Sequence, residues 1–96
     1  RDRIIAWLSD KTSERLNKSL VVSTLIEMDL TPTWSAHHSI NNDNIRKLGV
    51  SDPHNISGQL SVWVNIGLFF NKAHSFWIYF DKDDRLVAWE GRVVPY

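Results

Sequence analysis

The 96-residue chain contains no cysteine, so disulfide bonds and zinc sites built on thiolates are excluded. It also lacks an excess of either charge, with 11 Lys and Arg against 11 Asp and Glu. A general nucleic-acid binder gains most of its affinity by neutralising phosphates, so we expect no nucleic-acid partner for a chain of zero net charge. No apolar run approaches the ~18 residues of a membrane-spanning helix, and we expect no transmembrane segment.

Patterns that carry catalysis or hold metals are also missing. There is no Gly-x-Ser-x-Gly elbow and no Gly-rich phosphate loop, so we expect no enzyme, no catalytic residue and no cofactor. The adjacent His37 and His38 cannot easily present both rings to one metal ion, and we predict no metal site. We interpret the acidic residues Asp81, Asp83, Asp84 and Glu90 as those of a solvated hairpin turn rather than of a calcium site, because a calcium loop needs a Gly and a Glu that this segment lacks at the required positions.

Aromatic residues, in contrast, are plentiful, with five Trp, four Phe and two Tyr in a chain that is 43% hydrophobic. This composition predicts a folded protein with a packed core rather than a disordered chain. We expect residues 1–96 to form one domain, with a helical part over about 2–30, a long loop over about 31–59 and an antiparallel sheet over about 60–94.

The N-terminal part shows helical spacing. Residues 2–9 predict a short amphipathic helix. Residues 14–30 fit both a helix and a strand, because Leu20 to Leu30 also alternate with a period of two. The length and the stop at Pro32 favour a helix over about 14–29, with Thr12 or Ser13 as its N-cap. A further short helix is predicted near residues 43–48.

The C-terminal third predicts three strands, at residues 60–70, 76–80 and 85–94, joined by short turns. The predicted fold class is therefore α+β, a two-layer sandwich with the N-terminal helices packed on one face of a three-stranded antiparallel meander. A two-residue turn at Asp83–Asp84 and a four-residue loop over Asp81–Asp84 both place the same side chains on the face that packs against the helices. In either case we expect Asp84 to adopt a left-handed backbone conformation. The predicted core is Ile4, Leu8, Leu20, Leu25, Val62, Val64, Ile66, Phe76, Ile78, Phe80, Val87 and Trp89.

Alternation then places a second set of side chains on the sheet face away from the helices. An aromatic patch with a few polar groups is typical of a partner-binding surface. In the alternative, the loop at 34–59 folds back and buries these rings. The candidate binding residues are Trp63, Phe69, Trp77, Tyr79 and Glu90.

Residues 76–89 (FWIYFDKDDRLVAW) resemble the final hairpin of the BamE (SmpA/OmlA) family. In that family a strand ends in Phe-Asp, a short acidic or Gly turn follows, and the next strand opens with a Leu-Val pair. Residues 19–32 resemble the helix that precedes the family's sheet, and Val62–Val64 resemble its Trp-bearing first strand. The resemblance covers about half of the chain.

This resemblance implies a non-enzymatic lipoprotein domain of the Gram-negative cell envelope. Such a domain lies in the periplasm, is anchored by a lipid to the outer membrane in the full-length protein, and binds another envelope protein or a lipid headgroup. The start at Arg1 fits a processed or trimmed chain. Self-association is a further expected use of the aromatic face. The alternative functions are a small immunity or inhibitor protein that occludes a toxin or enzyme, and a small-ligand pocket between helices and sheet.

Overall fold

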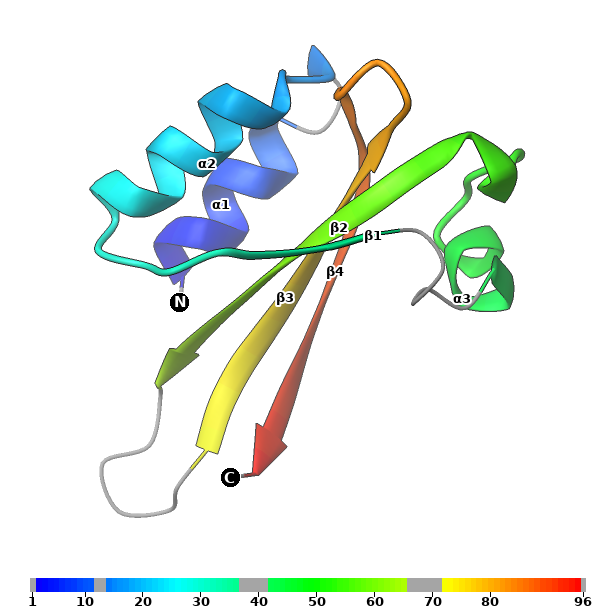
Figure 1. Cartoon of the computed structure of the whole chain (residues 1–96). Helices are drawn as coiled ribbons and strands as arrows, with labels where there is room; N and C mark the ends of the chain where they lie inside the picture. The colour runs from blue at the N-terminus through cyan, green and yellow to red at the C-terminus, as the bar shows by residue number, and fades with distance from the viewer. Residues whose placement is uncertain (1, 12–13, 37–41, 66–71, 96) are drawn as a thin grey trace.

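The computed structural model describes residues 2–11, 14–36, 42–65 and 72–95. It has the predicted α+β class, with helices α1 (Asp2–Lys11) and α2 (Lys18–Glu27) lying against an antiparallel sheet (Figure 1). The strands, in their order across the sheet, are β1 (Thr33–Ala36), β2 (Ile56–Asn65), β3 (Lys72–Asp81) and β4 (Leu86–Pro95). Between β1 and β2 the chain forms α3 (Asn42–Lys47) and the 3-10 helix η3 (Pro53–Asn55).

The sheet has four strands, which corrects the prediction of three. The additional strand, β1, falls within residues 31–59, where the sequence predicts a long loop. It pairs antiparallel with β2, so that Thr33 lies opposite Ser61 and Ala36 opposite Gly58. A strand of four residues directly after Pro32 is too short to show an alternating pattern, and this is why the sequence did not indicate it.

The ambiguous segment at 14–30 contains a helix, but a shorter one than predicted. Helix α2 begins at Lys18 because Asn17 is its N-cap, and the Asn17 side chain accepts a hydrogen bond of 2.9 Å from the Ser19 backbone N–H. Arg15 has a φ of 50° and Asp29 a φ of 64°, and such left-handed residues do not continue a helix. The predicted caps Thr12 and Ser13 lie outside the described residues.

Both helices bury one stripe against the sheet. Ile4 and Leu8 of α1, and Val21 and Leu25 of α2, are four residues apart and therefore lie on one side of each helix. They join a core cluster that includes Leu60, Val62, Phe76, Ile78, Phe80 and Leu86. The predicted core is confirmed at Ile4, Leu8, Leu25, Val62, Phe76, Ile78 and Phe80.

Other members of the predicted core are placed differently. Leu20 is 52% exposed, because α2 turns its neighbour Val21 toward the sheet instead. Val64 and Trp89 are half-buried and pack against the main cluster. Val87 packs on the opposite face of the sheet, and Ile66 lies outside the described residues.

A β-bulge in the final hairpin explains the position of Val87. Asp81 and Arg85 close a three-residue loop over residues 82–84, so that Phe80 pairs with Leu86. A three-residue loop by itself would invert every later side chain of β4. The register then shifts, so that Tyr79 pairs with Ala88 and Ile78 with Trp89. The extra residue, Val87, restores the predicted faces beyond the turn. Of the two loops left open, the two-residue turn predicts the pair of Ile78 with Trp89, which is observed, and the pair of Phe80 with Val87, which is not; the pair of Ile78 with Val87 that a four-residue loop predicts is also not observed.

The hairpin turn is not solvated throughout. Asp81 is 1% exposed, and one of its carboxylate oxygens accepts hydrogen bonds from the backbone N–H groups of Asp83 and Arg85, at 2.9 and 3.0 Å. The other oxygen accepts a hydrogen bond of 2.7 Å from the Arg15 guanidinium. Asp81 thus closes the turn and joins it to the segment that precedes α2.

None of the helices in the described ranges has the length and apolarity needed to cross a membrane.

Candidate functional site

The sheet face opposite α1 and α2, here called the outer face, contains the candidate binding residues. Register and alternation bring together on this face residues from three neighbouring strands. On β2 they are Gln59, Ser61 and Trp63; on β3, Ser75, Trp77 and Tyr79; on β4, Ala88, Glu90 and Arg92.

Helix α3 covers one end of the outer face. Figure 1 shows α3 on the opposite side of the strands from α1 and α2. Its Ile45 is fully buried and forms a second core cluster with Ile56, Tyr79 and Ala88. Tyr79 is 3% exposed in this cluster, so at this end the segment between β1 and β2 does fold back over the sheet.

The Tyr79 hydroxyl keeps a polar partner although its ring is buried. It donates a hydrogen bond of 3.1 Å to Oε1 of Glu90 on β4. Burial of the hydroxyl raises the pKa of Tyr79, and the nearby Glu90 carboxylate raises that pKa further. Tyr79 therefore keeps its neutral, hydrogen-bond-donating form to a higher pH than an exposed Tyr does.

Trp77 lies at the boundary between the covered and the open part of the face. Its ring is half-buried and packs against the cluster under α3. The guanidinium of Arg92 lies 5.4 Å from the centroid of this ring, a cation–π arrangement. Arg92 also lies 3.6 Å from Oε1 of Glu90, so one guanidinium contacts both an aromatic ring and a carboxylate.

Beyond Trp77 the outer face is open to solvent. Trp63 pairs with Ser75 across β2 and β3, diagonally next to Trp77, and it is 58% exposed. Such exposure of a Trp on regular secondary structure is unusual, because this side chain gains much free energy from burial. Among the Trp, Phe and Tyr side chains of the described ranges, Trp63 has the largest exposed fraction.

The five predicted binding residues therefore separate into distinct environments. Trp63 is exposed, Trp77 and Glu90 are half-buried, and Tyr79 belongs to the second core. Phe69 lies outside the described residues. The sequence left two alternatives open, an exposed aromatic patch and a loop that folds back over it. The structure contains both, at opposite ends of the outer face.

Arg92 is a site residue that the prediction missed. It follows Glu90 by two positions on β4, so the alternation that selected Glu90 also selects Arg92. The role of Ile45 had no comparable signal, because burial of the six-residue helix α3 depends on where the chain returns to the sheet.

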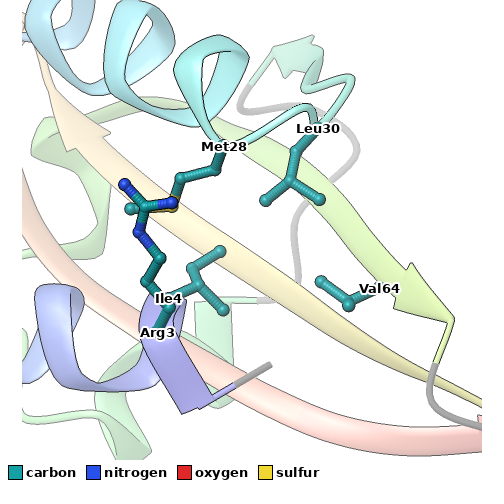
Figure 2. A pocket seen from close by; sticks show the side chains of 5 residues that line it. All are labelled: Arg3, Ile4, Met28, Leu30 and Val64. Carbon is teal, nitrogen blue, oxygen red and sulfur yellow. The ribbon is translucent and has the colours of Figure 1, made fainter.

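A small pocket between α1, the segment after α2 and β2 is another feature to consider as a ligand site. Figure 2 shows the side chains of Arg3, Ile4, Met28, Leu30 and Val64 around it. Its volume is about 140 Å³, well below the roughly 300–1,000 Å³ typical of sites that enclose a small-molecule ligand. The outer face is therefore the better candidate.

No family model, no curated protein and no solved structure matches this chain.

Proposed function

We propose that this chain is a non-enzymatic protein-interaction domain that binds another protein through the open end of the outer face, with Trp63 as the central contact. The observation that carries the proposal is the 58% exposure of Trp63 on a strand of the sheet. A Trp presented on a regular strand loses little conformational entropy when a partner covers it, and it contributes a large apolar area.

The neighbours of Trp63 support a protein partner. Trp77 lies diagonally next to it and Arg92 contacts Trp77, and Trp and Arg are two of the residue types that dominate binding energy at protein interfaces. Glu90 supplies a carboxylate next to Arg92, so the polar part of the site carries both charges. This mixture favours a protein surface over an anionic lipid headgroup, which is recognised mainly by clustered basic residues.

The compartment is part of the proposal and rests on the resemblance to the BamE family. We place the domain in the periplasm, attached through an N-terminal lipid to the outer membrane in the full-length protein, with a protein of the cell envelope as its partner. A signal peptide that ends before a lipid-modified Cys in the complete gene is the expected finding. A toxin gene next to it would instead favour the immunity function.

The experiment compares two substitutions of equally exposed apolar residues. Trp63→Ser removes the proposed contact, and Ile26→Ser is the matched control, because Ile26 is 59% exposed on α2 in the other layer. The tagged chain is recovered from its natural host, and co-purifying protein is compared between the parent and both variants. Thermal unfolding of each purified chain is measured in parallel.

We expect Trp63→Ser to lose the partner while its melting temperature stays close to that of the parent, and Ile26→Ser to keep the partner. Loss of folding in Trp63→Ser would instead make this ring a core residue. Retention of the partner by Trp63→Ser, or equal loss in both variants, would contradict the proposed site. Binding to anionic vesicles in place of a protein would also contradict it.

A further inference from the structure

Strand β4 forms one edge of the sheet, and most of this edge has no neighbouring strand in the described part of the chain. Only its start is covered, where the Leu86 N–H donates a hydrogen bond of 2.8 Å to the Leu16 carbonyl and Asn17 forms a bridge with Arg85. An edge of this kind presents unpaired backbone groups to a second strand. Natural edges are often protected by Lys or Pro; β4 contains no Lys, and its one Pro, Pro95, is the last residue of the strand, four positions beyond Gly91.

Two hydrogen bonds show which residues of β4 point their backbone N–H and C=O groups toward β3 and which point them away from the sheet. The Arg85 carbonyl accepts from the Asp81 N–H on β3, whereas the Leu86 N–H points outward to Leu16. The bulge at Val87 then turns Ala88 toward its partner Tyr79. Because direction alternates along a strand, the backbone groups of Trp89, Gly91 and Val93 point outward from the sheet.

We propose that two copies of this chain pair antiparallel through their β4 edges, about a two-fold axis at Gly91. In this register the outward backbone groups of Gly91 meet those of Gly91 in the second copy, and those of Trp89 meet those of Val93. The side chains of Glu90 and Arg92 lie between these positions on the outer face. Each Glu90 therefore faces an Arg92 of the second copy, which gives two symmetric ion pairs.

Charge also disfavours the adjacent registers. An axis at residue 90 would place Glu90 opposite Glu90, and an axis at residue 92 would place Arg92 opposite Arg92. Like charges directly opposite each other destabilise antiparallel pairing, so the register with its axis at Gly91 is selected over both of its neighbours. This complementarity of the strand with itself is why the proposed occupant is a second copy rather than an unrelated extended peptide.

The surface around the proposed axis leaves room for a second strand. Gly91 is exposed, Arg92 keeps 59% of its side chain exposed, and Val93 is 51% exposed. Gly91 itself cannot be used for mutagenesis, because a Cβ there would lie 2.8 Å from Nε2 of His74 within the same chain. The tests therefore change the charges on either side of it.

The first test measures the mass of the purified chain in solution, by sedimentation, at concentrations up to about 1 mM. We expect the mass to rise from that of one chain to that of two. Arg92→Glu, which places two Glu opposite each other, should weaken the dimer about tenfold or more. The double variant Glu90→Arg with Arg92→Glu exchanges the charges and should restore it, and the exposed Lys82→Glu is the matched control with no effect.

The second test needs no substitution and covers the case in which Glu90→Arg fails to fold because Tyr79 loses its partner. Hydrogen exchange of individual amides is measured on the parent at low and high concentration. We expect the amides of Trp89, Gly91 and Val93 to become protected only at high concentration, whereas those of Ala88, Glu90 and Arg92 are protected at both.

A single chain at every concentration would overturn the proposal, as would a dimer that is unchanged by Arg92→Glu or that leaves the three outward amides unprotected. This interface does not depend on the proposed function of Trp63. Trp63→Ser should leave the dimer intact, so the failure of one proposal is distinguishable from the failure of the other.

Discussion

The hydroxyl of Tyr79 donates a hydrogen bond of 3.1 Å to Oε1 of Glu90, which joins the core under α3 to the open part of the outer face. The same carboxylate lies 3.6 Å from Arg92, whose guanidinium is positioned at the ring of Trp77. The buried end of the face thus holds the polar groups of the exposed end in place through one acidic side chain.

This contact predicts a loss of stability at alkaline pH. The folded state raises the pKa of Tyr79, chiefly through burial, while the unfolded chain has an ordinary Tyr pKa of about 10. Above that pH the unfolded chain releases a proton that the folded chain retains, so the free energy of unfolding falls as pH rises. Below it this contribution to stability is fully present.

Urea unfolding of the parent and of Tyr79→Phe at about pH 8 and about pH 11 measures the effect. The variant should lose about 1 kcal/mol at the lower pH, where the hydrogen bond to Glu90 is missing, and fall less steeply at the higher pH. Parallel pH dependence of the two proteins would show that Tyr79 does not titrate differently on folding.

Asp81 is predicted to matter more to stability than its ion-pair partner. Asp81→Ala removes a buried carboxylate that accepts hydrogen bonds from two backbone N–H groups of the turn, and should cost about 2–4 kcal/mol in the free energy of unfolding. Arg15→Ala should cost less than about 1 kcal/mol, because the Arg15 side chain is 61% exposed and solvent screens its charge. Equal losses measured by denaturant unfolding would assign the stabilisation to the ion pair instead.

Asp84 was predicted to be left-handed, and its φ is 58°. Its backbone N–H and carbonyl bond to Asp81 and Lys18, and a Gly retains both groups. Asp84→Gly should therefore be neutral or stabilise the protein by up to about 1 kcal/mol, because Gly adopts this conformation without steric cost. The control is Asp83→Gly, at a position without a positive φ, which should lower the melting temperature slightly. A lower melting temperature for Asp84→Gly than for Asp83→Gly would refute this account of the turn.

The hairpin shows how far sequence reasoning reaches. The positive φ of Asp84 and the placement of Ile78 and Trp89 on the same face of the sheet follow from turn chemistry and alternation. The three-residue loop and the bulge at Val87 compensate each other, so neither changes the pattern of faces beyond the turn. A pattern can reveal a net shift of register, but it cannot reveal two shifts that cancel.

The candidate site, like the hairpin, could be predicted from the sequence only in part. Alternation was sufficient to place Trp63, Trp77, Tyr79 and Glu90 on one face of the sheet. Which of them is covered depends on α3, a helix whose position is set by tertiary contacts between Ile45 and the sheet rather than by any local signal. The exposure of Trp63 and the burial of Tyr79 therefore could not be separated from the sequence alone.

The central claim is that the open end of the outer face binds a protein, and position-specific crosslinking in the natural host tests it most directly. A photoreactive amino acid is introduced at position 63, and at position 26 of a second chain as the equally exposed control in the other layer. The account predicts a discrete crosslinked protein adduct from position 63 and none from position 26. Adducts from position 26 alone, or the same adducts from both positions, would contradict it.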